Sequence, residues 1–318
     1  MLRTKILGSS LVLLALGALS GCINDSVDSP QGASPTADGR LIRFTAGSSG
    51  GEMTRATTPY SGSFQVMADR TADDSPTGSS AWTAYMPDLT ATQSGEVWTT
   101  STSYYMPSSG TLRFYAYTSS QAEGVTALTP NSGRTADSAP VFTVADQQTR
   151  QYDLLTATAS AAYSTDAPVN ITFTHAMAAV WFSVKSGSMS GTISTVTIPD
   201  VSDGGTYTVD AGWGSLGSSA DYAVSYGSYD SNTKLLLVIP QDLGGKTVTI
   251  QFTPMGGTLT NLTATLPNPL SLTAGNRYEL QLNVSNDQVT ITAASIANWT
   301  DPYEGSTPPD EFKQKVTK

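Results

Sequence analysis

The sequence predicts an all-β protein made of two sandwich-like or barrel-like domains, and three observations carry this prediction. Short runs of alternating apolar and polar residues recur along the chain, separated by Gly, Ser, Asn and Pro. Lys and Glu, which favour helices, are scarce, whereas Thr, Val, Tyr and Gly are plentiful. The chain has 318 residues, 39% of them hydrophobic. That length exceeds the usual size of one hydrophobic core, so two domains are expected.

Six runs alternate with a period of two residues, as strands do when one face meets a core and the other meets water. The earliest, residues 41–46, points Ile42, Phe44 and Ala46 to one side. The inward-facing residues of the next two runs are Leu112, Phe114 and Ala116, then Ile171, Phe173 and His175. Those of the last three runs are Val248, Ile250, Phe252, Tyr278, Leu280, Leu282, Val284, Val289 and Ile291.

A seventh run differs, because it is apolar throughout. Residues 235–239 read Leu-Leu-Leu-Val-Ile without a polar break. A continuous apolar run of this length predicts a strand that is covered on both faces. No stretch follows the 3.6-residue period of a helix for more than one or two turns.

Composition also suggests where the domains begin and end. Residues 157–168 are small and polar with no strand pattern, so a boundary is expected there and the strand from Asn170 should open a second unit. We therefore expect an N-terminal domain at residues 41–160 and a C-terminal domain at residues 165–300. Residues 22–40 are rich in Ser, Asp, Pro and Gly, which is typical of a flexible tether. Residues 301–318 are expected to form a polar tail.

Residues 1–21 are expected to be a lipoprotein signal peptide. Two basic residues lie near the start, and the apolar stretch that follows is too short to span a bilayer. The stretch ends in Leu-Ser-Gly-Cys22, which resembles the bacterial lipobox, in which the cysteine is acylated. Cys22 is the only cysteine in the sequence. It is therefore the expected lipidation site, and it would anchor the protein to a membrane without spanning it.

The sequence carries no pattern of catalytic residues, and we expect no enzyme activity. It contains no G-x-S-x-G, no H-E-x-x-H and no phosphate-binding loop. The one histidine, His175, faces inward by strand parity and is expected to be a buried structural residue. One His and one Cys do not provide a typical zinc site, and no cofactor is expected. The net charge of −10 and the lack of a Lys/Arg run exclude nucleic-acid binding.

The order of short motifs resembles the fimbrillin family, the type V pilins of Bacteroides-type bacteria. The lipobox comes first, followed by the strand at residues 41–46, and the resemblance covers nearly the whole chain after Cys22. The later matching segments are Trp82, Trp98, Tyr104-Tyr105, residues 112–117, Asp153-Leu154-Leu155, residues 171–178, residues 272–280 and residues 296–299.

This resemblance implies a fold and a way of assembly. It implies two transthyretin-like β-sandwich domains in tandem, export as a lipoprotein and display at the outer membrane. It also implies that an Arg-specific protease removes the N-terminal segment and that subunits then join by strand exchange. The expected partners are other fimbrillin subunits, the same chain or a different one, together with the protease and the membrane that holds the lipid.

Strand exchange requires a removable strand, a cleavage site and a donor strand, and the sequence contains a candidate for each. The strand bearing Ile42, Phe44 and Ala46 would be removed by cleavage after Arg55, which follows a Ser/Gly run expected to be accessible. Arg40 and Arg43 are alternative sites, but cleavage there would leave more of the strand attached. Val289, Ile291 and Ala293 form a candidate donor strand with matching alternation, and Ile296 and Trp299 add further anchors.

Two alternatives stay open at this point. Residues 288–300 could complete the sheet of their own domain, in which case the protein could be a tip subunit or an uncleaved anchor. The protein could also be a surface glycan-binding lipoprotein, a class that is likewise lipidated and β-rich. Exposed Trp and Tyr side chains on a solvent-facing platform would distinguish that class.

Overall fold

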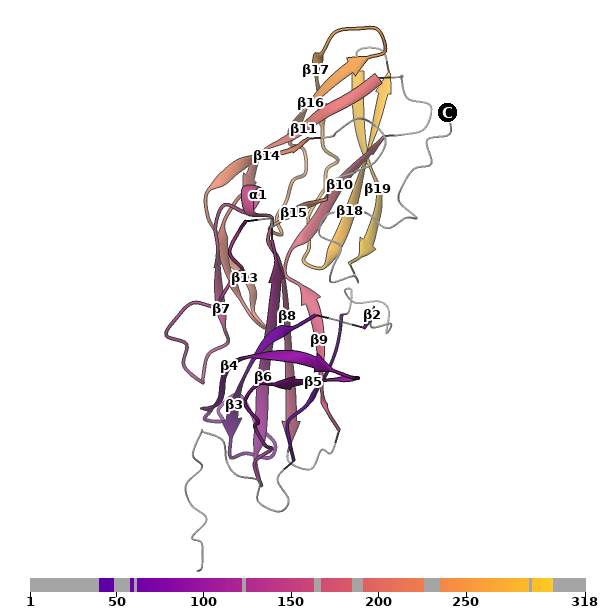
Figure 1. Cartoon of the computed structure of the whole chain (residues 1–318). Helices are drawn as coiled ribbons and strands as arrows, with labels where there is room; N and C mark the ends of the chain where they lie inside the picture. Colours follow the sequence, from indigo (N-terminus) through magenta and orange to yellow (C-terminus); the bar gives the residue numbers. More distant parts are fainter. Residues whose placement is uncertain are drawn as a thin grey trace, which may run out of the picture.

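The computed structural model describes residues 40–48, 58–59, 62–121, 124–162, 167–184, 191–225, 235–285 and 288–299. These residues are mostly β, arranged in several sheets, and the helix among them, α1 (Gln147–Arg150), has four residues. The molecule is elongated, with one group of sheets above another (Figure 1). The prediction of a β-rich protein is therefore confirmed.

An eight-stranded sheet forms the lower part of the molecule (Figure 1). The strand β1, which is the first in the sequence, also pairs with β9 at the far end of the sheet, so the sheet closes on itself around a core. In spatial order the strands are β2 (Thr58–Pro59), β1 (Phe44–Ser48), β5 (Val97–Thr100), β4 (Thr83–Ser94), β3 (Phe64–Thr71), β6 (Thr111–Ser120), β8 (Asp153–Ala162) and β9 (Val169–His175).

Two four-stranded sheets form the upper part and face each other across a second core. One contains β15 (Leu236–Val238), β10 (Ala178–Val184), β18 (Asn276–Ser285) and β19 (Gln288–Asn298), in that order. The other contains β14 (Ser219–Ser225), β11 (Gly191–Ser202), β16 (Thr247–Pro254) and β17 (Thr260–Thr265).

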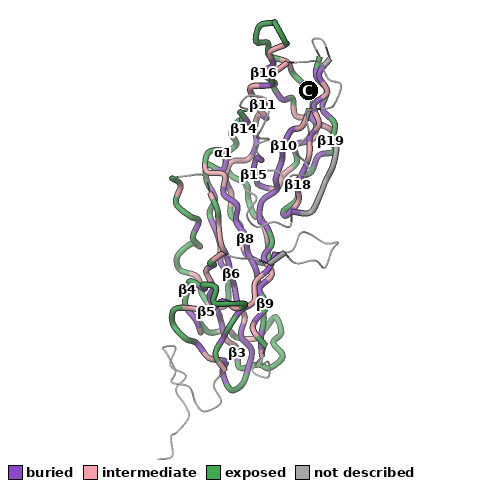
Figure 2. The backbone as a smooth tube through the Cα atoms, turned by 45° about the vertical axis from the view of Figure 1, so that its right-hand side comes forward, coloured by how far each residue is buried: buried purple, intermediate pink, exposed green. Residues whose placement is uncertain are grey.

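A third core joins the two parts. It is accompanied by a three-stranded sheet that contains β13 (Gly212–Leu216), β12 (Gly205–Thr208) and β7 (Val141–Val144). We call this third core the junction core; its members come from β3, β6, β8, β10, β12 and β15, among others. Figure 2 shows β8, β10 and β15 buried over most of their length where the two parts meet.

The continuous apolar run at residues 235–239 lies between two cores, as predicted. Leu236 and Val238 pack into the upper core, whereas Leu235, Leu237 and Ile239 pack into the junction core. The alternating strands at residues 246–252 and 277–284 likewise bury the predicted side chains.

Two expectations about the lower sheet need correction. In β6, Leu112, Phe114 and Ala116 are buried as predicted, but Tyr115 and Tyr117 on the opposite face are buried too, because the junction core covers that face. The strand from Asn170, expected to open the second unit, is instead β9 of the first sheet. The chain passes to the upper sheets at residues 176–177, within an apolar stretch that has no turn-like composition.

Candidate functional site at the closing strand

The strand β1 holds the lower sheet closed. It runs parallel to β9, with Phe44 opposite Val169 and Ser48 opposite Phe173 at the two ends of the pairing. On its other side Phe44 lies opposite Trp98 of β5, and the end of β1 pairs with β2. The chain just before β1 is also held, because the Ile42 N–H donates to the Tyr104 carbonyl at 2.8 Å.

The first five residues of β9 depend on β1 for their strand pairing. In the described part of the chain, β8 meets β9 only at Thr174 and His175, whereas residues 169–173 pair with β1. Removal of β1 would therefore expose a row of backbone donors and acceptors along β9. Such an edge is a template for a strand from elsewhere.

The side chains of β1 fill the middle of the lower core. Phe44 is fully buried, and its ring meets Phe64 and Phe114 edge-on at centroid distances of 6.0 and 5.6 Å. Ile42 is 3% exposed, Ala46 is half-buried, and Arg43 is exposed on the other face. The alternation predicted for this strand is therefore present.

The energy of these contacts is large on the scale of a domain. Burying Ile42 and Phe44 is worth roughly 3–6 kcal/mol together, and each backbone hydrogen bond to β9 contributes about 1 kcal/mol. The free energy of unfolding of a whole domain is about 5–15 kcal/mol. Loss of β1 would thus remove much of the stabilisation of the lower core unless another strand replaced it.

A buried tyrosine hydroxyl, that of Tyr85, makes a polar contact beside this segment. The Tyr85 hydroxyl donates to the carbonyl of Tyr105, the residue opposite Leu41 in an isolated bridge. Burial raises the pKa of Tyr85 above its ordinary value, and the nearby Arg70 only partly opposes that effect. The hydroxyl therefore stays protonated and available as a donor at neutral pH.

The candidate donor strand, β19, lies at the opposite end of the chain. It is the outermost strand of its sheet and pairs antiparallel with β18 from Gln288 to Asn298. Val289 and Ile291 are buried in the upper core, whereas Ala293 is exposed. The backbone of Ile296 pairs with Tyr278, and its side chain lies outside the described residues. In this structure β19 completes the sheet of its own part.

The end of β19 is fixed to the end of β9 by three buried side chains, which we call the junction cluster. The Trp299 indole stacks on the His175 ring at 3.7 Å with an angle of 10° between the planes. His175 Nδ1 lies 2.7 Å from Asp153 Oδ1, and both side chains are fully buried. The backbone N–H of Trp299 donates to the Gly275 carbonyl at 2.7 Å, and the backbone N–H of Gly275 donates to the Met177 carbonyl at 2.9 Å.

The structure brings His175 and Trp299 into contact, which the sequence did not predict. His175 is buried, as strand parity predicted. Its contact with Asp153 was not predicted, because the two residues are 22 positions apart and no spacing rule links them. Trp299, which is expected to anchor a donated strand, packs beside β9 in this structure, and its role as an anchor stays a prediction. The expected lipidation site Cys22 and the expected cleavage site Arg55 lie outside the described residues.

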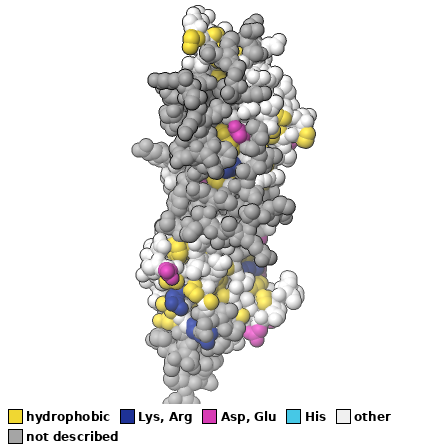
Figure 3. Space-filling view, turned by 90° about the vertical axis from the view of Figure 1, so that its right-hand side faces the viewer, with side chains coloured by type: hydrophobic (Ala, Val, Ile, Leu, Met, Phe, Trp, Pro, Cys, Tyr) yellow, Lys and Arg dark blue, Asp and Glu magenta, His cyan; other side chains and the backbone are white. Residues whose placement is uncertain are grey.

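The described residues form no metal site, and the face drawn in Figure 3 carries charges of both signs. Among the described residues no group of three or more His, Cys, Asp or Glu side chains could hold a metal ion. On the face shown in Figure 3, basic and acidic side chains are mixed over the lower part, and no histidine is visible. No helix within the described ranges is long and apolar enough to cross a membrane.

Comparison with known proteins gives one family match and several structural matches. The sequence matches the fimbrillin-like family over residues 54–299. A fimbrial protein from Bacteroides vulgatus has a similar structure, with a TM-score of 0.59 and 16% sequence identity over 82% of this chain and 100% of that one. Curated proteins give no match.

A second solved structure has the same fold. It is a protein from Bacteroides uniformis designated a candidate for cell adhesion, with a TM-score of 0.55 and 18% identity over 84% of this chain and 100% of that one. At these identities the resemblance concerns the fold.

Proposed function

This chain belongs to the fimbrillin-like family, and from that membership we propose that it is a fimbrial subunit or accessory lipoprotein that serves adhesion at the cell surface. The family consists of structural adhesion proteins and not of enzymes. The structural relatives described as a fimbrial protein and as a cell adhesion candidate support the same role.

Subunits of this protein assemble by strand exchange at the groove that β1 fills. The observation that carries this proposal is that one short N-terminal strand closes the lower sheet and is the partner of residues 169–173 of β9. A strand of this kind can leave without breaking any other strand pairing of β9. The groove left behind would combine an unpaired edge with an apolar floor, which includes Phe64 and Phe114.

Cleavage after Arg55 opens the groove. Arg55 lies between β1 and β2 in the sequence, so the cut separates the closing strand from the rest of the chain. The family match begins at Thr54, beside this arginine, and leaves β1 outside. An Arg-specific protease would thus leave a subunit that contains all but the first two residues of the part shared with the family.

The donated strand is β19 of a neighbouring subunit. Val289, Ile291 and Ala293 follow the same spacing, and the same order of two large residues and one small, as Ile42 just before β1 and Phe44 and Ala46 within it. Ile296 adds a further apolar position. The incoming strand would have to run parallel to β9, as β1 does.

The route to the surface follows from the N-terminal sequence. Residues 1–21 direct export, Cys22 is acylated, and the lipid holds the unprocessed subunit at the outer membrane. The lower and upper parts correspond to two tandem transthyretin-like β-sandwich domains. The partners are other fimbrillin subunits and the processing protease.

Limited proteolysis tests this proposal. The chain from residue 23 would be treated with a trace of trypsin, and mass spectrometry would identify the new N-terminus while SDS electrophoresis followed the size of the products. We expect cleavage after Arg55 followed by multimers that resist SDS. The R55A variant should remain uncut at this position and monomeric, whereas R43A, altered directly before the closing strand, should still be cut after Arg55.

Each other outcome has a distinct meaning. Cleavage after Arg55 without multimers would contradict exchange between copies of this protein. It would be compatible with a tip subunit, or with a donor strand that comes from a different protein. Surface protein from cells that still begins at acylated Cys22 would contradict processing at Arg55 and would favour an uncleaved anchor.

A further inference from the structure

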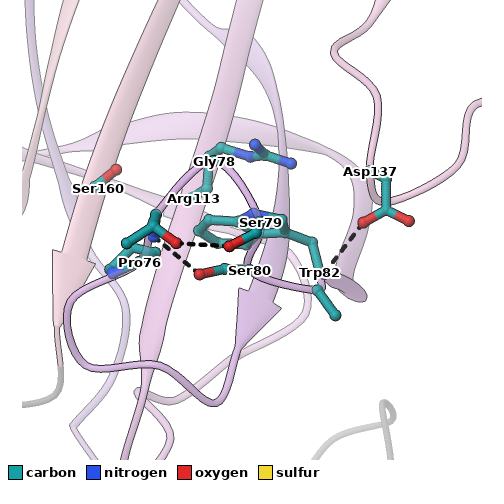
Figure 4. A pocket seen from close by; sticks show the side chains of 10 residues that line it. Pro76, Gly78, Ser79, Ser80, Trp82, Arg113, Asp137 and Ser160 are labelled. Atoms are coloured by element: carbon teal, nitrogen blue, oxygen red, sulfur yellow. Dashed lines mark hydrogen bonds between the residues drawn. The ribbon is translucent and has the colours of Figure 1, made fainter.

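The end of the lower part that lies away from the upper sheets contains an open pocket. Its volume is about 510 Å³, which falls within the range of small-molecule sites. The loop between β3 and β4 forms one wall, and β6, β8 and the loop before β7 contribute the others. The lining residues that matter for recognition are Ser79, Ser80, Trp82, Arg113, Asp137 and Ser160 (Figure 4).

The aromatic wall of the pocket is held in place before any ligand arrives. The backbone N–H of Trp82 donates to Asp137 Oδ1 at 3.2 Å, which holds the main chain, and the Arg113 guanidinium carbon lies 4.1 Å from the centroid of the Trp82 ring, which holds the side chain. Arg113 is itself fixed, because its Nη2 donates to the Ala136 carbonyl at 2.8 Å. Trp82 is only half-buried, so part of the indole remains open to the pocket.

The loop wall is ordered by its own side chains. The Thr77 N–H donates to Ser80 Oγ at 2.9 Å, and the hydroxyls of Thr77 and Ser79 lie 3.1 Å apart. Figure 4 shows Ser79 and Ser80 in front of the Trp82 ring. The loop therefore presents hydroxyl groups, which can both donate and accept hydrogen bonds.

The charges around the pocket balance. The buried carboxylate of Asp69 receives two hydrogen bonds from Arg134, at 2.7 and 2.9 Å, and lies 3.5 Å from Arg113. Asp137, which is exposed and lines the pocket, adds a second negative charge. The two arginines and the two carboxylates together carry no net charge. A site with no net charge favours a neutral polar ligand over an ion.

We propose that this pocket binds a neutral sugar ring. The C–H face of the ring packs on the open part of Trp82, as apolar faces of polar molecules do on aromatic rings. Its hydroxyls donate to Asp137 Oδ2 and accept from Arg113 and the loop serines. This site goes beyond the proposed assembly function, because none of its residues belongs to β1 or β19.

Saturation-transfer NMR on the chain from residue 23 tests the proposal. The probes are methyl β-D-galactoside and methyl α-D-mannoside, with methyl β-D-galacturonate as the charged counterpart of the first. We expect at least one neutral glycoside to bind more tightly than the galacturonate. The W82A and D137N variants should each weaken that binding by about tenfold, as expected for loss of a stacking surface or of a charged acceptor.

Two further variants keep the result interpretable. W82F retains an aromatic face and should bind within a few-fold of the unchanged chain, which separates stacking from folding. D242N is the matched control, because Asp242 is an exposed carboxylate that also accepts one backbone N–H, from Gly244 at 2.9 Å, and lies outside the pocket. It should bind normally.

Three results would overturn the proposal. They are no transfer from either neutral glycoside at millimolar concentration, equal binding by W82A and the unchanged chain, and preference for galacturonate. None of them bears on cleavage at Arg55 or on multimer formation, so the two proposals fail separately.

Discussion

At the scale of single residues, the junction cluster is the contact that brings the two ends of the proposed exchange together. His175 ends β9, whose edge would accept a strand, and Trp299 follows β19, the strand that would be donated. Asp153 completes the cluster from the start of β8. A buried carboxylate needs such a partner, because an unpaired one would be costly to remove from water.

We predict that His175 and Trp299 are energetically coupled. In a double-mutant cycle with H175A and W299A, the coupling energy in the free energy of unfolding should be about 1 kcal/mol or more, as for residues in direct contact. Denaturation in urea measures it. A control cycle pairs H175A with F252A, because Phe252 lies in the upper core. That pair should be additive within about 0.5 kcal/mol, and equal coupling in both cycles would contradict a specific stack.

At the scale of elements, β1 has the features of a strand that another chain could replace. Its backbone pairs with β9 over five residues and its side chains reach the core at alternate positions. Specificity for the replacing strand then has two components. The backbone bonds accept any extended chain, whereas the pockets select large side chains at the positions of Ile42 and Phe44.

We predict that a peptide with the sequence of residues 40–48 binds the chain that begins at residue 56. Fluorescence anisotropy of the labelled peptide measures the binding. Replacing the phenylalanine that corresponds to Phe44 with aspartate should weaken binding by at least about a hundredfold, because a charge would enter a dry aromatic core. Replacing the residue that corresponds to Arg43 with alanine should have little effect, since Arg43 is exposed.

Equal affinity of all three peptides would contradict a groove that reads side chains. Failure of the truncated chain to bind any of them, with its far-UV circular dichroism unchanged, would contradict the proposal that β1 can be replaced at all.

How far the sequence predicts an element depends on how locally its burial is determined. The run at residues 235–239 was predicted to be covered on both faces, and it is, because five consecutive apolar side chains leave no face for water. In β6, Tyr115 and Tyr117 did not indicate burial of the second face, because tyrosine is found both at protein surfaces and in cores. Their burial depends on β7 and β12, which only the tertiary structure places nearby.

The step from β9 to β10 could not be found from composition for a related reason. Loops between domains are usually polar and rich in Gly or Pro. Here residues 176–177 are Ala and Met, fully packed in the junction core. The boundary was predicted at residues 157–168 because this stretch is polar, but β8 occupies its first half.

At the scale of the whole molecule, the junction core makes the two parts mechanically dependent. β7 belongs to the N-terminal half of the sequence but pairs with β12, which comes after β10 and β11. Phe142 of β7 is fully buried and meets Tyr117 of β6 at 5.1 Å. A continuous path of packed side chains therefore connects the lower sheet to the upper sheets.

We predict that the chain from residue 23 unfolds in one cooperative thermal transition. In scanning calorimetry the ratio of calorimetric to van't Hoff enthalpy should be close to one. F142A should raise that ratio above one by loosening the junction. F252A, which removes a phenylalanine from the upper core, should lower the melting temperature without changing the ratio. Two separate transitions in the unchanged protein would contradict the coupling.

The parallel pairing of β1 with β9 has one more consequence. The groove that β1 fills accepts a strand in one direction. When β19 of the next molecule fills it, the contact joins two different surfaces of the two subunits. Contacts of this kind repeat without closing and produce filaments whose two ends are unlike. A fibre of this protein would therefore have polarity, because one end would present an empty groove and the other end a β19 strand that has not been donated.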